Sequence, residues 1–501
     1  MSEIGARSQR VESRLPDPET RDSVIYNPSA DQLRAFSEDL ETQTEFGSPS
    51  YVSAEKSRNA EKTKNRIDSE FDEADWAFID EALEAASEAE MVCVDRQVGR
   101  HPENSYVCRY YVPKWYGRIA LGLSKLLEPA ETDREPDFYT LQLPEWDETK
   151  IRILPERGLT VVAGSDYFGE AKKSFLRLFM YYSKQQGGLG LHAGSKQVRL
   201  QADDGTETVG QLFLGLSGTG KSTLTAHGLW LDDPEGATML QDDVCALRPD
   251  GTVAGSEGKG LFVKTHGLDE ETEPEIYAAT TDDSAVVENV DVANDGTVDF
   301  DSDRYTKNGR AIIQREKLRS AGDEVDLPEV DQIFFITRNP AMPPVAKLNP
   351  EEAAVAFMLG ESVQTSAGDP TAAGESIRVV GTNPFIIGSK GKEGNRFRDL
   401  IADLDVECYV LNTGRVGSRD VGVQDTITLL RAISRGTVEW ETDTATDLTV
   451  PADVPEMDVE EFDVAENLSD YEAAISDLRT ERDQYLDQFD DLDDSIEQAL
   501  Y

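Results

Sequence analysis

The chain has 501 residues, enough for two or three domains, and 38% of them are apolar, which supports a sizeable core. Asp and Glu number 98 against 49 Lys and Arg, so the formal net charge is −49. A field of this sign repels nucleic acid and anionic membranes, and we expect neither as a partner. The acid excess is spread over the whole chain. We interpret it as adaptation to a halophilic, high-salt cytoplasm, because salt screens the repulsion between dense carboxylates.

Cysteine and histidine are scarce in this chain. No C-x-x-C pair occurs, so we expect no disulfide framework or zinc site, and a reducing compartment fits the four cysteines Cys93, Cys108, Cys245 and Cys408. No apolar run is long enough to span a membrane, and the N-terminus lacks the apolar segment of a signal peptide, so we expect a soluble, cytoplasmic protein. Any metal site that uses imidazole must draw on His101, His192, His227 and His266.

The first part of the chain predicts an N-terminal α/β domain. After a polar stretch up to residue 70, apolar side chains recur at helical spacing in residues 73–88, 115–127 and 169–183. Short apolar runs predict strands at residues 91–95, 105–112 and 159–167. Gly187, Gly188 and Gly190 then interrupt the pattern, and we place the domain boundary after residue 187.

A glycine-rich stretch follows the apolar run 212–214 and precedes a helix-compatible run at 222–231. It has the pattern G-x-x-x-x-G-K-S, which is typical of a loop whose backbone N–H groups bind phosphate. Lys221 would reach the β- and γ-phosphates, and the Ser222 hydroxyl would bind a magnesium ion. The alternative is a glycine-rich loop that matches by chance. The nucleotide-binding residues expected from this motif are Gly215, Leu216, Ser217, Gly218, Thr219, Gly220, Lys221, Ser222 and Thr223.

Strands and helices alternate around this loop. Strands are predicted at residues 237–241, 331–337 and 407–412, and helices at 351–360 and 425–434. This alternation predicts a C-terminal P-loop mononucleotide-binding domain of residues 188–450, with a mixed sheet and the nucleotide at its edge. The whole chain is therefore expected to be a two-domain α/β protein.

Residues 451–501 predict an acidic, helical C-terminal extension. Apolar and aromatic side chains recur there at alternating four- and three-residue spacing, with one arginine among them: Tyr471, Ile475, Leu478, Arg482, Tyr485, Phe489, Leu492 and Ile496. A helix that packs on its own domain is favoured over a dimer-forming coil. We therefore expect a monomer, with an oligomer formed through this helix as the alternative.

Two pairs of charged residues lie where nucleotide chemistry would need them. Asp242 and Asp243 directly follow the apolar strand 237–241, and strand-end acids can hold the metal ion of a nucleotide. Such an acid pair also often begins a turn. Lys172 and Lys173 stand together in a chain with twice as many acids as bases, although periodicity alone would place both on a solvated helix face.

Together these segments resemble ATP-dependent phosphoenolpyruvate carboxykinase. The Y-x-G-E-x-K-K segment of that family matches residues 167–173, and its M-H-C-S-A-N segment matches residues 191–196, where only His192 is kept. Further segments resemble those of the family in the same order, at residues 273–277, 288–290, 299–310, 343–348, 411–415 and 424–426. The resemblance covers residues 90–436 and leaves the C-terminal extension outside.

The resemblance implies a decarboxylating lyase of gluconeogenesis, which converts oxaloacetate and ATP to phosphoenolpyruvate, CO₂ and ADP through a metal-stabilised enolate. One divalent ion, Mg²⁺, would accompany the nucleotide at Ser222, and a second, Mn²⁺, would lie at the substrate. By position, Lys173, His192 and Asp243 would hold the second ion, and Lys173 would then have to be a neutral amine. The alternative for His192 is a buried, hydrogen-bonded structural histidine.

The resemblance also implies roles for further residues. Lys221 and Lys264 would neutralise the transferred phosphoryl group. Arg310 would bridge substrate and phosphate with its planar fork. The catalytic positions carried over from the family are Lys172, Lys173, Lys221, Lys264, Arg310, Tyr167 and Arg58, the last two near the substrate carboxylate, with a surface arginine as the alternative for Arg58. Additional nucleotide-binding positions are Asp242, Glu275, Arg310 and Thr426.

The chain departs from the family at several places: the segment after His192 is altered, and the glycine-rich stretch before Lys264 is one residue longer. Phe262 replaces a tyrosine two residues before Lys264, and Asp420 stands where the family usually has an arginine near the adenine. The phosphate loop favours ATP over GTP, while Asp420 leaves the strictness of that choice open. Two alternative functions are a P-loop kinase that phosphorylates a protein or metabolite hydroxyl, and a catalytically inactive nucleotide-binding regulator. Only the carboxykinase needs Lys173, His192 and Asp243 on one ion.

Overall fold

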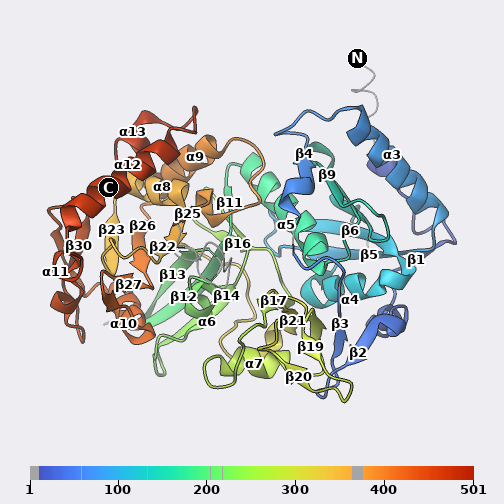
Figure 1. Ribbon diagram of the computed structural model, residues 1–501, viewed down its shortest axis with the longest axis horizontal. Helices are drawn as coiled ribbons and strands as arrows, with labels where there is room; N and C mark the ends of the chain where they lie inside the picture. Colours follow the sequence, from blue (N-terminus) through green and yellow to red (C-terminus); the bar gives the residue numbers. More distant parts are fainter. Residues whose placement is uncertain (1–10, 58, 132–133, 203–204, 217, 364–375) are drawn as a thin grey trace. The chain divides into compact units, whose positions relative to one another are not determined.

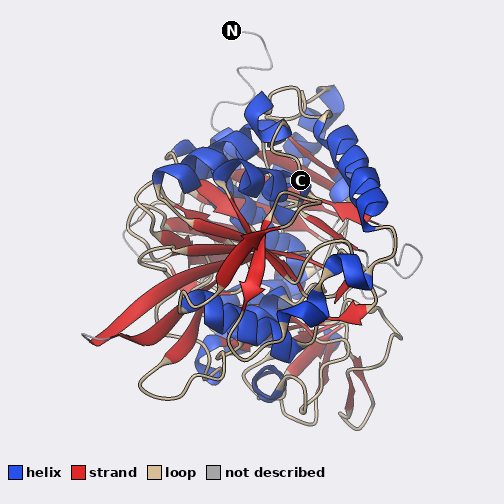
Figure 2. Cartoon of the chain, turned by 90° about the vertical axis from the view of Figure 1, so that its left-hand side faces the viewer, coloured by secondary structure: helices blue, strands red, loops and turns tan. Residues whose placement is uncertain are grey.

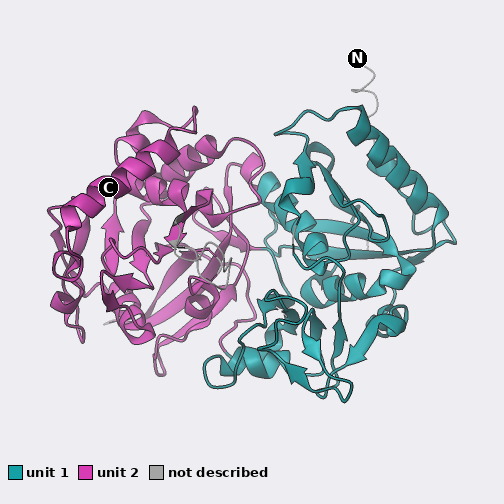
Figure 3. Cartoon of the chain, in the orientation of Figure 1, with its two compact units in different colours: residues 1–182, 256–319 teal, residues 183–255, 320–501 magenta. Residues whose placement is uncertain are grey.

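The computed structural model describes residues 11–57, 59–131, 134–202, 205–216, 218–363 and 376–501. The chain forms two compact units, which Figure 3 shows in different colours. Unit 1 comprises residues 1–182 and 256–319, and unit 2 comprises residues 183–255 and 320–501. Both units are mixed α/β, which confirms the fold class at that level.

The larger sheet of unit 1 has the strand order β1-β5-β6-β8-β10-β9-β4, and β7 pairs with β5. Its strands are β1 (Val24–Tyr26), β4 (Thr63–Asn65), β5 (Met91–Val98), β6 (Tyr106–Pro113), β7 (Glu128–Pro129), β8 (Phe138–Leu143), β9 (Lys150–Leu154) and β10 (Leu159–Ala163). The helices of this part are α2 (Ala30–Ala35), α3 (Glu73–Glu88), α4 (Gly117–Leu126) and α5 (Phe168–Gln185). Helix α3 has the predicted length, and its side chains Trp76, Ile79 and Leu83 are buried in one core with residues of the sheet.

A second sheet of unit 1 has the order β17-β21-β18-β3-β2 and lies beside α7 in Figure 1. Its strands are β2 (Glu41–Gln43), β3 (Pro49–Tyr51), β17 (Gly260–Lys264), β18 (Val286–Glu288) and β21 (Arg310–Gln314), and the same segment contains α7 (Pro274–Thr280), β19 (Asp291–Val292) and β20 (Val298–Asp299). Strand β18 pairs with β3 in parallel. This pairing joins residues 256–319 to unit 1, whereas we expected them within the domain of residues 188–450.

The main sheet of unit 2 has the order β14-β12-β13-β22-β26-β23-β30-β29. Its strands are β12 (Ala193–Ala202), β13 (Gly205–Leu214), β14 (Gly236–Gln241), β22 (Gln332–Thr337), β23 (Val345–Leu348), β26 (Glu407–Asn412), β29 (Glu439–Thr442) and β30 (Thr449–Asp453). Strands β13, β22 and β26 run parallel, so their carboxyl ends lie at one edge. The smaller strands are β11 (Leu189–Leu191), β15 (Cys245–Leu247), β16 (Val253–Gly255), β24 (Glu361–Val363), β25 (Ser376–Arg378), β27 (Arg415–Val416) and β28 (Arg419–Asp420).

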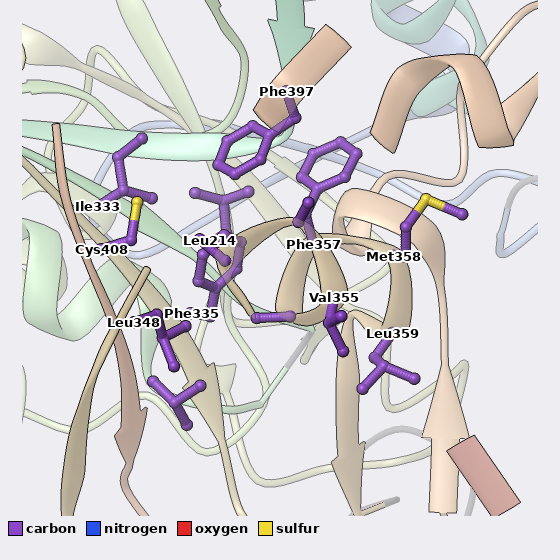
Figure 4. Packing of buried hydrophobic residues seen from close by; sticks show 14 of the residues in the cluster. Leu214, Ile333, Phe335, Leu348, Val355, Phe357, Met358, Leu359, Phe397 and Cys408 are labelled. Carbon is purple, nitrogen blue, oxygen red and sulfur yellow. The ribbon is translucent and has the colours of Figure 1, made fainter. Parts of the chain in front are cut away.

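Helices cover both faces of this sheet, and Figure 2 shows its twisted strands between them. On one face, α8 (Pro350–Leu359) and α9 (Lys390–Asp403) pack on alternate strand residues such as Leu214 and Phe335, with Phe357 and Phe397 stacked at 4.6 Å between centroids (Figure 4). On the other face, α6 (Lys221–Ala226) and α10 (Val423–Ser434) pack on the intervening residues. Burial on both faces explains why these strands read as continuous apolar runs.

The C-terminal extension packs within unit 2. The short α11 (Val464–Asn467) contributes Val464, α12 (Tyr471–Leu486) contributes Ile475 and Leu478, and α13 (Asp494–Glu497) contributes Ile496 to the same core as α8. The regular spacing therefore does not form one long helix, because α12 ends at Leu486. Arg482, the polar break in the pattern, is buried and pairs with Glu361 at 3.0 Å.

Among the described residues, no helix is long and apolar enough to cross a membrane. The four cysteines are all buried and unpaired with one another.

Candidate active site

The glycine-rich stretch forms the turn between β13 and α6 in unit 2. Gly218 and Gly220 have φ angles of 83° and 98°, which only glycine adopts without strain. Thr219 is buried, its hydroxyl donates to the carbonyl of Leu216, and its own carbonyl accepts from Thr413 Oγ1 at 2.8 Å. The loop is thus held to the segment that follows β26. Ser217 lies outside the described residues.

Helix α6 is shorter than the predicted run of 222–231. It ends at Ala226, because the backbone of His227 is extended, and the left-handed conformations of Leu229 and Trp230 keep the helix from resuming. Ser222 and Thr223 are exposed in its first turn. Beneath the helix, the fully buried Lys196 on β12 donates to the backbone carbonyls of Leu224 and His227. Lys196 thereby satisfies carbonyls at the C-terminal end of α6.

Three of the predicted site residues converge in unit 2. His192 Nε2 lies 2.9 Å from Asp243 Oδ1, and Lys221 Nζ lies 3.3 Å from the same nitrogen and 3.6 Å from the same oxygen. His192 comes from the end of β11, Lys221 from the start of α6, and Asp243 from the turn after β14. The phosphate-loop lysine therefore lies close to two of the three side chains that were predicted to hold the second metal ion.

The ring orientation of His192 suits metal binding. Its Nδ1 lies 2.7 Å from the backbone carbonyl of Thr382, which can only accept, so Nδ1 carries a hydrogen. Burial, reinforced by the Lys221 ammonium, lowers the pKa of His192 below its ordinary value, although Asp243 opposes this shift. A neutral ring then presents the lone pair of Nε2 towards the Asp243 carboxylate. Nitrogen and oxygen donors that face each other in this way fit a divalent cation between them.

Asp242 is a second residue whose surroundings suit a bound cation. Its Oδ1 is buried and has no hydrogen-bond partner among the described residues, which is costly for a carboxylate oxygen unless a cation approaches it. Among those residues, no group of three or more His, Cys, Asp or Glu side chains forms a metal site. The predicted set has only one histidine and one carboxylate, with Lys173 as its third member. Lys173 is carried by α5 in unit 1.

A second group of predicted residues lies in unit 1. Lys264 and Arg310 are directly opposed in the antiparallel β17–β21 pair. Burial, followed by the charge of Arg310, lowers the pKa of Lys264. The Arg310 guanidinium also lies over the ring of Phe262, 5.4 Å from its centroid, and Lys172 Nζ lies 5.3 Å from the same centroid. Phe262 therefore still offers an aromatic face to cations, although it lacks the hydroxyl of the family tyrosine.

Tyr167 is packed into the same part of unit 1. It is 1% exposed, and its hydroxyl accepts from Asn308 Nδ2 at 3.3 Å, while Asn308 Oδ1 accepts from Arg310. Gly169 makes this position possible, since a Cβ there would lie 2.3 Å from the tyrosine ring. Lys173 Nζ lies over that ring, 5.3 Å from its centroid. The Y-x-G-E-x-K-K segment thus forms a defined local structure.

The remaining predicted residues differ in their surroundings. Lys172 is 3% exposed and forms an ion pair of 2.9 Å with the equally buried Glu257, so its charge is already balanced within unit 1. Glu275 lies on α7 of unit 1, whereas the phosphate loop belongs to unit 2. Thr426 is buried in the first turn of α10, where its hydroxyl donates to the carbonyl of Gly422. Arg58 lies outside the described residues.

Three residues of these groups were not predicted. Asn308 lies within the segment 299–310 that resembles the family, so a sequence signal was available for it. Thr382 acts through its backbone carbonyl, which no side-chain pattern reveals. Lys196 stands in an alternating strand where a lysine predicts an exposed position, and only the structure shows that it lies under α6.

A strand, a glycine-rich loop and a helix, with a lysine in the loop and acids after a nearby strand, are typical of enzymes that transfer a phosphoryl group from a nucleotide. Comparison with known protein families identifies which enzyme of this class the chain is similar to. The family model of phosphoenolpyruvate carboxykinase matches residues 48–460, and the chain belongs to this family.

Curated relatives agree with this assignment. The phosphoenolpyruvate carboxykinase (ATP) of Aeropyrum pernix is 34% identical over 424 residues, which cover 84% of this chain and 85% of the relative. Proteins of the same name from Chelativorans sp. (strain BNC1) and Mesorhizobium japonicum are 28% and 32% identical, covering 81% and 62% of this chain and 77% and 57% of the relatives. The family and the enzyme class predicted from the sequence are thereby confirmed.

Proposed function

We propose that this chain catalyses the ATP-dependent decarboxylation and phosphorylation of oxaloacetate to phosphoenolpyruvate, CO₂ and ADP. Membership of the family supports the reaction, and the names of the relatives support ATP as the phosphoryl donor. The observation in the structure that carries the proposal is the convergence of Lys221, His192 and Asp243. A kinase acting on a hydroxyl would need the lysine and the acid but not the histidine.

We assign the nucleotide to the strand–loop–helix of unit 2. The backbone N–H groups of residues 215–220 would bind its phosphates, and the Lys221 ammonium would neutralise the β- and γ-phosphates. Ser222 and Asp242 would hold Mg²⁺ with the nucleotide. The exposure of Ser222 and the unpartnered Oδ1 of Asp242 support this assignment. Thr426 and Glu275 remain proposed nucleotide contacts.

His192 and Asp243 are the proposed ligands of Mn²⁺, with Lys173 as the third. When bound, the ion supplies positive charge that stabilises an enolate oxygen. The Thr382 carbonyl holds the His192 ring so that Nε2 is the available donor. Lys173 would have to be neutral to donate, a state that the charge of the bound ion would itself favour.

Unit 1 would supply the groups that bind the substrate. Arg310 and Lys264 together present two cations. Burial is the main cause of the lowered pKa of Lys264, and repulsion by the charge of Arg310 adds to it. An anionic substrate or phosphate would relieve this repulsion, so the pair is suited to oxaloacetate and to the transferred phosphoryl group. Tyr167, with Asn308 beside it, would position the substrate carboxylate, and Arg58 keeps its proposed role there. Lys172 would act through its buried pair with Glu257 rather than by direct contact.

The assay combines oxaloacetate, ATP, Mn²⁺ and Mg²⁺ in molar KCl and measures phosphoenolpyruvate. His192→Ala should lower turnover by about a hundredfold or more while ADP binding persists. His101→Ala, a histidine of unit 1 outside these groups, serves as the matched control and should keep full activity. Folded wild-type protein that forms no phosphoenolpyruvate would refute the proposed reaction, and unchanged turnover in His192→Ala would remove that residue from the site.

Three further properties are proposed on the sequence alone. The charge of −49 supports a halophilic protein, which should unfold on dialysis from molar KCl to low salt as screening is lost. Persistent structure in low salt, measured by circular dichroism, would count against this proposal. We also propose a monomer, to be checked by sedimentation, and a cytoplasmic location, which the four unpaired cysteines suit.

A further inference from the structure

Arg338 occupies a central position at the edge of the unit 2 sheet. It directly follows Thr337, the last residue of β22. Strand β22 lies between β13 and β26 and is parallel to both. Because the carboxyl ends of parallel strands meet at one edge, Arg338 emerges at the edge where β13 continues into the glycine-rich loop.

Local packing ties Arg338 to that loop. A Cβ placed on Gly414 would lie 3.0 Å from Arg338 Cβ and 3.2 Å from its Cγ, so the arginine stem rests directly on the backbone of Gly414. The preceding residue, Thr413, donates its N–H to the carbonyl of Thr337 at 3.0 Å and its hydroxyl to the carbonyl of Thr219 at 2.8 Å. Arg338 is therefore separated from the loop by one residue and one hydrogen bond.

The guanidinium of Arg338 has no acceptor within the described part of the chain. Its Nε is buried without a hydrogen-bond partner, and burial lowers its pKa. This is unexpected in a chain with 98 acids and 49 bases. Three arginines that are more deeply buried pair with carboxylates: Arg118 with Glu288, Arg152 with Asp75, and Arg482 with Glu361. A partly desolvated guanidinium without an acceptor costs free energy, which an anionic ligand would recover.

The strand order indicates which part of a nucleotide Arg338 would meet. Strands β14 and β13 are both antiparallel to β12, so Asp242 and Asp243 follow β14 at the same edge, on the other side of β13 from β22. Thr426, the proposed base contact, follows β26 beyond β22. In the strand order, Arg338 therefore lies between the acids after β14 and Thr426 after β26. A nucleotide with its terminal phosphate towards the acids and its base towards α10 would bring its innermost phosphate to β22.

We propose that Arg338 binds the phosphate nearest the ribose of an adenine nucleotide. The inference rests on the proposed function, since it assumes that a nucleotide occupies the loop. Arginine suits this task because its planar fork can donate two hydrogen bonds to one phosphate, and a half-buried guanidinium keeps its charge. It adds a nucleotide contact that the sequence did not single out.

The test measures the binding of ADP, AMP and adenosine by calorimetry in molar KCl. Arg338→Met should weaken ADP and AMP by about 10- to 100-fold and leave adenosine unchanged, because only the first two carry the phosphate. Arg338→Lys should restore part of the loss. Arg199→Met, an exposed arginine on β12, is the matched control and should bind all three ligands as the wild type does.

Two outcomes would overturn the inference. One is unchanged ADP and AMP binding in Arg338→Met, and the other is an equal loss for adenosine, which would indicate a disturbed fold rather than a lost phosphate contact. A folded wild type that binds none of the three ligands would overturn the proposed function as well. A wild type that binds ADP while Arg338→Met binds it equally well would overturn the inference alone.

Discussion

Lys196 offers a prediction about stability that follows directly from its burial. Its ammonium is fully buried on β12, has Phe213 beneath it, and donates to the carbonyls of Leu224 and His227. No carboxylate is among these partners. Burial therefore lowers the pKa of Lys196 from its ordinary value of 10.5 to about 7. The change we consider is Lys196→Met, which keeps the apolar stem and removes the charge.

The sign of the effect follows from proton binding. Between about pH 7 and 10.5 the unfolded chain holds a proton on Lys196 that the folded chain has released, so the stability of the wild type rises with pH. The slope is about 1.4 kcal/mol for each pH unit once the pH exceeds the folded pKa. From pH 7 to pH 9 the wild type should gain about 2 kcal/mol relative to Lys196→Met. Burial, with a contribution from Lys196, also lowers the pKa of the neighbouring His227, so His227 should not titrate in this range.

The assay is urea unfolding of both proteins in molar KCl, followed by tryptophan fluorescence at several pH values. Only the difference between the two proteins is interpreted, because all other titrating groups are shared. A difference that stays constant from pH 7 to pH 9 would contradict a depressed pKa for Lys196. It would mean that the hydrogen bonds to the helix carbonyls keep Lys196 charged despite its burial.

Two further predictions concern unit 2. Gly194→Ala places a methyl group 2.2 Å from Thr225 Oγ1, so helix α6 must shift. The affinity for ADP, measured by calorimetry, should then fall about tenfold. Gly236→Ala is the control, because the nearest atom to its new methyl group is 3.7 Å away, and it should bind ADP normally. Burial alone would raise the pKa of Glu361, but Arg482 and Arg378 hold it at about 2. The carboxylate therefore contributes stability that is lost as the pH falls from about 4.5 towards 2. Glu361→Gln should cost about 3 kcal/mol in urea unfolding at pH 7 and show a weaker acid dependence than the wild type; equal stability at pH 7 would contradict this.

Elements with strong local patterns could be predicted closely. The strand predicted at 407–412 has those bounds in β26, and the helix predicted at 73–88 has those of α3. The strand is marked by a continuous apolar run and the helix by apolar residues three to four positions apart. Both patterns depend only on residues that are close in the sequence. Helix α6 was overestimated because the left-handed conformations of Leu229 and Trp230 are set by packing after the helix rather than by its own residues.

For the candidate site, the grouping of residues could be predicted where it depends on side-chain identity. Lys221, His192 and Asp243 were identified by their match to motifs, and the structure places them in contact. The Thr382 carbonyl that orients His192 comes from a distant segment, and every residue type has such a carbonyl. Grouping residues 256–319 with unit 1 likewise depends on a strand pairing between distant segments, for which a single sequence carries no signal.

That pairing has a consequence for biosynthesis. Residues 49–51 emerge from the ribosome long before their partner strand at 286–288, and all of residues 183–255 are synthesised in between. The smaller sheet of unit 1 therefore stays incomplete while the first segment of the other unit is already outside the ribosome. Unit 1 therefore cannot complete this sheet before residues 183–255 have been synthesised, and closing such a long loop is slow. Neither unit corresponds to one continuous stretch of gene, so truncation at a single point cannot yield either of them without a segment of the other.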